Sequence, residues 1–312
     1  MYTYQNPREV YGNVLLQMAR ENPEIVALDA DLCKSTMTTL IEKNLPGQYF
    51  EMGIGEQNMM SIAGGLSLTG KIPFVNSFAI FLVSRAFDQI RQAVGIPGLN
   101  VKIIGSSAGL SDFGDGATHQ TIEDIALMRS VPGMTVIAPC DANQLAKAVK
   151  AITEYHGPVY LRYSRNNMAD LTLPSDTFTI GEVYTLHEGT DVTVFSHGDS
   201  LLKVLNVAAR LKSENINILV ANVPTLKPLN RQKIIDLSSK TKAVVTVEEH
   251  SVIGGLGSAV AEALRLEKIP VEFVGINDTF GKSGHSHSDL SDYFGLAEKN
   301  IIDAINNVLK YK

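Results

Sequence analysis

Short apolar, β-branched runs alternate with longer amphipathic segments along the chain, and this alternation is the feature that most constrains its fold. The longer segments place apolar residues at helical spacing. Strands separated by helices predict parallel sheets with helices on both faces. The expected strands are residues 25–29, 72–76, 101–105, 135–139 and 159–163 in the first half, and 191–198, 216–223, 243–250 and 271–276 in the second.

The alternation of strand and helix patterns is interrupted once, by a polar stretch at residues 166–180. We therefore predict an α/β protein of two doubly wound domains, with a first domain at 1–170, a linker at 171–184 and a second domain at 185–312. A length of 312 residues suits two domains of ~100–200 residues each. Helices are expected at 8–20, 85–94 and 141–155, and from about Asp199, Leu256 and Leu296.

Composition and charge narrow the class of protein. Hydrophobic residues make up 45% and charged residues 19%, which is typical of a globular chain. A net charge of −6 without a basic run argues against nucleic-acid binding. The chain has only two cysteines, Cys33 and Cys140, and they lie far apart in the sequence, so they indicate no disulfide framework. We therefore expect the protein to be in the reducing cytoplasm. No signal peptide and no apolar run of ~20 residues is recognised, so we expect no membrane segment.

Glu56 follows a glycine-spaced turn at residues 53–55 and enters a helix of small residues. A glutamate at a helix start gains ~0.3–1 kcal/mol from the helix dipole and needs no other function. Glycines, however, also let a backbone turn sharply or approach a ligand. Inside a helix, Gly64 and Gly65 cost ~1 kcal/mol each relative to alanine, so we expect a neighbouring backbone to pack there.

A long, glycine-rich loop at residues 106–124 holds Asp115 and His119 among other polar groups. Long loops in compact domains are often functional. Gly114-Asp115-Gly116 imitates the GDG that begins the metal-diphosphate motif of thiamine enzymes. The paired asparagines come too late for that motif, beyond a strand, so we expect no metal site on this chain.

Aromatic and basic residues also follow strand ends, where open parallel sheets bind ligands. Phe78 and Phe81 could stack on a flat ligand. Arg8, Arg162 and Arg165 each have a planar guanidinium that can donate two hydrogen bonds to a phosphate.

Two motifs of the second half have no clear assignment. Glu248-Glu249-His250 precedes a glycine run that is not a dinucleotide fingerprint, and His285 and His287 form a weak metal pattern.

Four stretches together resemble the C-terminal half of transketolases. They are MGIGEQNMMSIAGGLSLTG, PFVNSFAIFLVSRAFDQIR, GDGATHQTIEDIALMRSVPGMTVIAPCDANQL and VVTVEEHSVIGGLGSAVAEAL, and they occur in the family's order. The resemblance implies that the first domain binds the pyrimidine of thiamine diphosphate and that the second is a transketolase C-terminal-like domain. The family's diphosphate-binding domain has no counterpart here, which implies a separate partner chain.

The resemblance also implies roles around the cofactor. Glu56 matches the glutamate that hydrogen-bonds N1′ of the aminopyrimidine and favours the imino tautomer, which generates the ylide nucleophile. Phe78 and Phe81 match aromatics that flank the pyrimidine, with Phe81 as the stacking ring. Asp31 matches an acidic residue near the cofactor. Ser107 stands where many members have a cofactor- or substrate-contacting histidine, which indicates a variant ketose or branched sugar as an alternative to pentose phosphates.

Substrate-binding roles follow in the same way. Asp115 and His119 match residues that hold sugar hydroxyls, and we count His119 with Glu56 as catalytic. Arg8, Ser35 and Arg165 match groups that bind the substrate phosphate.

The implied function is that of one subunit of a split, thiamine-diphosphate-dependent transketolase, which transfers a two-carbon ketol unit from a ketose phosphate to an aldose phosphate. An N-terminal transketolase subunit would share the cofactor and carry the divalent metal, Mg²⁺, in an α2β2 assembly. The β subunit of a 2-oxo acid dehydrogenase first component and a non-catalytic transketolase-like partner stay open. The residues DGATHQ at 115–120 and SRNN at 164–167 favour transketolase. Deoxyxylulose phosphate synthase is less favoured, because it carries both halves on one chain.

Overall fold

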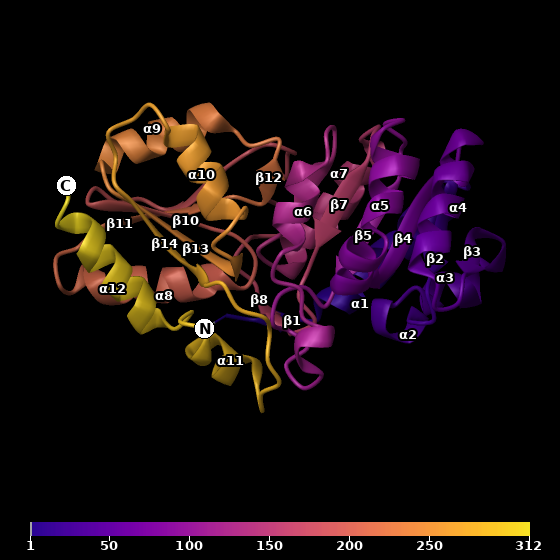
Figure 1. Cartoon of the computed structure of the whole chain (residues 1–312), viewed down its shortest axis with the longest axis horizontal. Coiled ribbons are helices and arrows are strands. Elements are labelled where there is room, and N and C mark those ends of the chain that lie inside the picture. Colours follow the sequence, from indigo (N-terminus) through magenta and orange to yellow (C-terminus); the bar gives the residue numbers. More distant parts are fainter. Residues whose placement is uncertain (1) are drawn as a thin grey trace.

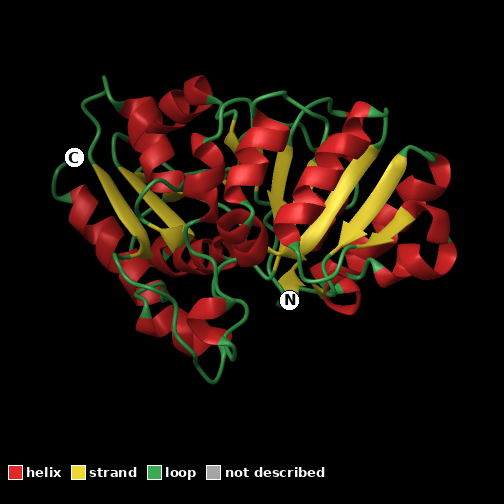
Figure 2. Ribbon diagram, turned by 45° about the vertical axis from the view of Figure 1, so that its right-hand side comes forward, coloured by secondary structure: helices red, strands yellow, loops and turns green. Residues whose placement is uncertain are grey.

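Two sheets lie side by side in the computed structural model, which describes residues 2–312 (Figure 1). The first half of the chain builds most of one sheet and the second half builds the other. Figure 2 shows the strands of both sheets flanked by helices. The prediction of an α/β protein with two doubly wound domains is confirmed.

The first sheet has seven strands in the order β12-β6-β7-β5-β4-β2-β3. Adjacent strands in this sheet are parallel, with one exception. β12, which comes from the second half of the chain, is antiparallel to β6. All strands expected in the first half are confirmed within a few residues, whereas the short β3 and β12 were not expected. The bounds are β2 (Ile25–Asp29), β3 (Tyr49–Glu51), β4 (Ile72–Phe78), β5 (Lys102–Ser106), β6 (Thr135–Ile137), β7 (Val159–Arg162) and β12 (Thr225–Lys227).

Helices cover both faces of this sheet because successive strand residues point to opposite sides. Ile25 and Ala27 pack with α1, α3 and α7, while Val26 and Leu28 pack with α4 and α6. The bounds are α1 (Pro7–Glu21), α2 (Cys33–Thr36), α3 (Thr39–Asn44), η1 (Pro46–Gln48), α4 (Glu56–Leu68), η4 (Gly116–Thr118), α6 (Asp124–Ser130) and α7 (Ala142–Glu154).

The helix expected at 85–94 is not a regular α-helix, and this prediction is corrected. Its inward-facing residues Ala86, Ile90 and Val94 are buried as the pattern predicts. Side-chain spacing does not reveal the wider hydrogen-bonding of π-helical turns, which are frequent at functional sites. The segment consists of π-helical η2 (Phe81–Arg85), α5 (Phe87–Gln89) and π-helical η3 (Ile90–Gly95).

The close packing expected at the glycine pair of α4 is confirmed at one position only. A Cβ added to Gly64 would lie 2.8 Å from the carbonyl oxygen of Ala93, on η3. A Cβ on Gly65 would have no neighbour within 4 Å. Gly64 therefore permits the contact between the two helices, and Gly65 does not take part.

The second sheet has five strands in the order β14-β13-β10-β11-β9, of which β9 is antiparallel to β11. The core cluster on one face includes α8 and α12, and the cluster on the other includes α9 and α10. The bounds are β9 (Tyr184–His187), β10 (Val192–Ser196), α8 (Ser200–Lys212), β11 (Ile218–Asn222), α9 (Arg231–Thr241), β13 (Val244–Ser251), α10 (Leu256–Leu264), β14 (Val271–Ile276), α11 (His287–Tyr293) and α12 (Glu298–Leu309).

The two sheets are tied together at their junction. One cluster of buried apolar side chains extends from Val26 in the first sheet to Val244 in the second. A two-residue strand near the N-terminus, β1 (Tyr4–Gln5), pairs with β8 (Met168–Ala169), and no helix or strand lies between Ala169 and Tyr184. Loops at this junction can therefore be held from both halves of the chain.

No helix within residues 2–312 has both the length and the apolar character needed to cross a bilayer.

Candidate active site

The carboxyl ends of β2, β4 and β5 meet at one edge of the first sheet, as their parallel pairing requires. Just beyond this edge, Asp31 and Ser107 have left-handed backbone conformations, with φ of 60° and 54°. Such conformations are uncommon without glycine and concentrate at functional sites. Glu51 Oε1 accepts hydrogen bonds from the backbone N–H of Asp31 (2.9 Å) and of Gly53 (2.8 Å). One carboxylate thus joins the loops that follow β2 and β3.

Glu56 is the first residue of α4, and its side chain is only 1% exposed. Arg85 Nη1 donates to both carboxylate oxygens of Glu56, at 2.8 and 2.7 Å. The Arg85 side chain itself is 47% exposed. Glu56 therefore does more than complement a helix dipole. Its buried carboxylate accepts hydrogen bonds from the half-exposed guanidinium of Arg85.

Aromatic rings complete this corner of the site. The Arg85 guanidinium lies over the ring of Phe81, with Cζ 4.9 Å from the ring centroid. Phe81 stacks with Phe78 at 5.8 Å between centroids, and His119 packs edge-on against Phe81 at 5.3 Å. The fold thus brings Glu56, Phe78, Phe81 and His119 into one cluster, although they come from separate elements.

Arg85 indicates which kind of group this cluster accepts. The guanidinium is flat, carries N–H donors for Glu56 and offers a π face to Phe81. An aminopyrimidine is also flat and can donate a hydrogen bond to a carboxylate. The residues present therefore fit the pyrimidine of thiamine diphosphate.

A cavity of about 460 Å³ lies beside the loop that follows β5. Three of the residues expected to bind substrate line it, namely Arg8, Asp115 and Arg165. Arg165 pairs with the buried carboxylate of Asp112, whereas the Arg8 Nε is buried without a hydrogen-bond partner among the described residues. A guanidinium with an unused donor suits an oxyanion such as phosphate. The remaining lining residues are Asn6, Ser111, Asp112, Phe113, Gly114, Asn166 and Asn167.

The other predicted site residues lie outside this cavity. Asp31 is exposed, and Ser35 lies on the short helix α2. His119 is part of the aromatic cluster, and its Nδ1 lies 2.9 Å from Thr118 Oγ1. Ser107 is fully buried, and its Oγ has no hydrogen-bond partner within residues 2–312. The structure thus places most of the predicted residues in an aromatic–carboxylate cluster or an arginine-lined cavity, whereas Asp31, Ser35 and Ser107 belong to neither.

Asp29, at the end of β2, organises the segment that carries Ser35. Its carboxylate accepts hydrogen bonds from the backbone N–H of Leu32 (2.7 Å) and from the hydroxyls of Thr36 (2.6 Å) and Thr38 (2.8 Å). Burial raises the pKa of Asp29 to about 6, although these hydrogen bonds oppose the shift.

Two residues of the site were missed in the sequence analysis. Arg85 lies four residues after Phe81, a spacing that places both side chains on one helix face, and this was the available signal. Asp112 lies in an irregular loop, where no periodic pattern could indicate that it would pair with Arg165.

Comparison with known families matches both domains of the chain. Residues 4–170 match the transketolase pyrimidine-binding domain, and residues 181–301 match the transketolase C-terminal domain. The chain belongs to the transketolase family. The resemblance to transketolases seen in the four sequence stretches is confirmed.

Two relatives within the family are similar over nearly their whole length. The 6-deoxy-6-sulfo-D-fructose transketolase subunit SqwH of a Clostridium species is 40% identical over 98% of this chain and 95% of its own. One of the subunits of the apulose-4-phosphate transketolase of Phocaeicola vulgatus is 36% identical over 94% of each chain.

A solved transketolase structure has the same fold. It is described as a split-gene transketolase in an inactive β4 tetramer, and it superimposes with a TM-score of 0.90 at 45% identity. The superposition covers 97% of this chain and 98% of that chain.

Proposed function

We propose that this chain is the pyrimidine-binding and C-terminal subunit of a thiamine-diphosphate-dependent transketolase, which transfers a two-carbon ketol unit from a ketose phosphate to an aldose phosphate. The observation that supports this most directly is the buried Glu56 carboxylate, which takes N–H donors beside the ring of Phe81. Both relatives described above are named as transketolase subunits, which supports a partner chain with the diphosphate- and metal-binding domain. We propose an α2β2 assembly of the two chains.

Glu56, Phe78 and Phe81 would hold the cofactor's pyrimidine, with Mg²⁺ and the diphosphate on the partner chain. Thiamine diphosphate, when bound, supplies the carbon–carbon bond chemistry. Glu56 would hold a proton at N1′ of the pyrimidine, and its burial strengthens this interaction by excluding water. Phe81 would orient the ring by stacking. Asp31 and Ser107 would lie nearby, at the ends of β2 and β5.

Arg8 and Arg165 would bind the anionic end of the sugar, and Asp115 and His119 would hold its hydroxyls. A guanidinium binds any tetrahedral oxyanion that accepts two hydrogen bonds. The names of the two relatives, which refer to a sulfonated ketose and to a branched ketose phosphate, support anionic ketoses as the donor class.

The experiment is reconstitution. The chain is assayed alone and with a partner chain that has the GDG…NN motif, using xylulose 5-phosphate, apulose 4-phosphate and 6-deoxy-6-sulfofructose as donors. We expect ketol transfer only from the two chains together. Activity of the chain alone would contradict the split arrangement. Turnover of pyruvate instead would favour the 2-oxo acid dehydrogenase β subunit, and no thiamine diphosphate binding by the assembled chains would favour a non-catalytic partner.

A further inference from the structure

The end of β13 carries three consecutive ionisable residues, Glu248, Glu249 and His250, and each holds a different part of the molecule. Glu248 accepts two backbone N–H groups at the start of α10, at 2.7 and 2.8 Å, within its own domain. His250 Nε2 accepts the backbone N–H of Ala126 on α6, in the first domain, at 3.3 Å. Because side chains alternate along a strand, Glu249 points away from these two.

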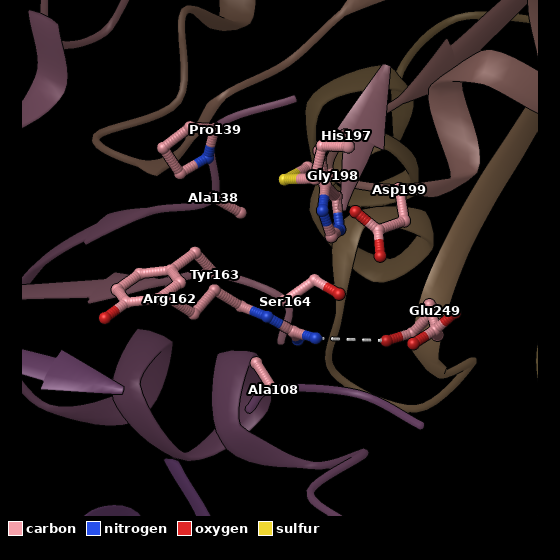
Figure 3. A pocket seen from close by; sticks show the side chains of 11 residues that line it. Ala108, Ala138, Pro139, Arg162, Tyr163, Ser164, His197, Gly198, Asp199 and Glu249 are labelled. Carbon is pink, nitrogen blue, oxygen red and sulfur yellow. Dashed lines mark hydrogen bonds between the residues drawn. The ribbon is translucent and has the colours of Figure 1, made fainter. Parts of the chain in front are cut away.

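Glu249 contacts the loop that carries Asp115 and His119, the residues proposed to bind the sugar hydroxyls. Its Oε1 accepts the backbone N–H of Leu110 at 2.8 Å, and its Oε2 lies 2.7 Å from His287 Nε2. In Figure 3, Arg162 extends across the domain junction toward Glu249, and Arg162 Nη2 donates to the Glu249 carbonyl oxygen at 3.3 Å. Arg162, Asp199 and Glu249 all line a cavity of only about 20 Å³. Glu249 is therefore a buried charge with defined partners on both domains.

The loop from Gly109 to Thr121 is closed at its base by an antiparallel bridge between these two residues. Leu110 follows the base on one side, and Asp115 and His119 lie within the loop. The hydrogen bond from Leu110 to Glu249 thus fixes one end of this loop to the second domain.

The opposite end of the loop is held by the same domain. The Gln120 side chain donates to the carbonyl oxygen of Lys282 at 2.9 Å and accepts from its backbone N–H at 2.8 Å. The backbone N–H of Gly284 donates to the carbonyl oxygen of Phe113 at 2.8 Å. Residues 282–284 lead directly into α11, whose first residue is His287, so the Glu249–His287 pair anchors this segment as well.

Gly109 shows how closely Glu249 approaches the loop. Gly109 has a φ of 69°, and a Cβ added there would lie 2.3 Å from Glu249 Oε1. A side chain at this position would displace the carboxylate from the Leu110 amide.

We infer that Glu249, held by His287, is a positioning residue of the second domain that fixes the 109–121 loop and thereby aims Asp115 and His119 at the sugar. This role rests on the proposed function, because Asp115 and His119 have their sugar-binding roles only there. The inference gives a role to one residue of each unassigned motif in the second domain. These residues are Glu249 of the Glu-Glu-His run and His287 of the histidine pair.

The test compares Glu249→Ala with Glu248→Ala. Glu248 is a buried carboxylate on the same strand with two backbone partners of its own, and it does not contact the loop. Amide hydrogen exchange is measured on the isolated chain, and the KM and kcat for the donor sugar are measured on the chain assembled with its partner.

We expect exchange at Leu110 and across the loop to rise ~10-fold or more in Glu249→Ala and to stay near wild type in Glu248→Ala, because a charged hydrogen bond to the loop is lost only in the first. The donor KM should rise ~10-fold in Glu249→Ala with little change in thiamine diphosphate affinity. If Glu249→Ala does not fold, His287→Gln removes the ion pair and should give the same changes at smaller size.

Equal loop exchange in the two alanine variants would overturn the inference, as would faster exchange with an unchanged KM. If the wild-type assembly transfers no ketol unit from any donor, the proposed function fails. In that case the exchange comparison alone decides whether Glu249 holds the loop.

Discussion

Arg85 donates to both carboxylate oxygens of Glu56 and at the same time covers one face of Phe81. Arg85 therefore occupies the two groups that are proposed to hold the cofactor's pyrimidine, and cofactor binding has to displace it. Because Arg85 is about half exposed, this ion pair is screened by solvent and contributes ~1 kcal/mol or less.

We expect Arg85→Met to bind thiamine diphosphate more tightly in the assembled enzyme, by up to ~5-fold. Calorimetric titration measures the change. Arg91→Met is the control, because Arg91 is exposed on the neighbouring segment η3. Weaker binding in Arg85→Met would show instead that Arg85 supports the bound cofactor.

Glu56→Gln should lower the ketol-transfer rate of the assembled enzyme by ~10²–10⁴-fold, because an amide cannot exchange a proton with the pyrimidine. The amide oxygen can still accept a hydrogen bond from Arg85, so the fold should persist, as circular dichroism would show. Asp88→Asn removes an exposed carboxylate on α5 and should leave the rate unchanged. Near-normal turnover in Glu56→Gln would remove Glu56 from the mechanism.

Arg8→Met should raise the KM for a phosphorylated or sulfonated ketose by ~10–100-fold, because a charged hydrogen bond to the anion is lost. The Arg8 Nε has no protein partner among the described residues, so the loss should appear in binding more than in stability. Arg20→Met, at the exposed end of the same helix, serves as the control. An unchanged KM for anionic donors would separate Arg8 from the substrate.

The two glycines of α4 should respond to alanine with opposite signs. Gly64→Ala places a Cβ 2.8 Å from a backbone carbonyl and should destabilise the chain by ~1–3 kcal/mol. Gly65→Ala meets no neighbour within 4 Å and should stabilise it by ~0.5–1 kcal/mol through helix propensity. Denaturant unfolding measures both, and equal effects would contradict the packing of η3 on Gly64.

The Glu249–His287 pair should make stability pH-dependent. The charge of Glu249 raises the pKa of His287 from 6.5 to about 9. The folded state then binds a proton that the unfolded state lacks between these values, so the stabilisation is complete below pH 6.5 and is lost as the pH rises through 9. Asp199 and Lys203 also act on the pKa of His287. The pH dependence of wild-type stability is therefore compared with that of a variant that lacks the histidine.

Wild type should exceed His287→Gln in unfolding free energy by ~3 kcal/mol at pH 6, and the two should converge near pH 9.5. Denaturant titrations at both pH values measure this difference. A difference that stays constant between them would show that folding does not raise the pKa of His287.

Much of the fold could be predicted because the relevant information is local. Residues 25–28 form a continuous apolar run, and the strand expected at 25–29 becomes β2 with the same bounds. β12 was missed, because three residues are too short for any period, and its place depends on the edge of a sheet built by the other half of the chain. The π-helical turns around residue 85 were also missed, because they bury the same residues as a regular helix.

The candidate site divides in the same way. The strand-end rule and the family resemblance drew attention to Glu56, Phe78, Phe81 and His119, and the structure places these four side chains in one cluster. Their roles remain predictions. Asp112 could not have been found, because its partner Arg165 lies 53 positions away in the sequence.

By itself, the sequence determined the alternation of strands and helices, the two-domain α/β class and the family, because side-chain spacing and short motifs are written along the chain. The tertiary structure alone decided that Arg85 covers Glu56 and that Glu249 holds the 109–121 loop. These contacts join residues 29 and 139 positions apart. Their hydrogen bonds depend on how two complete sheets and their loops pack together, and no local pattern records that packing.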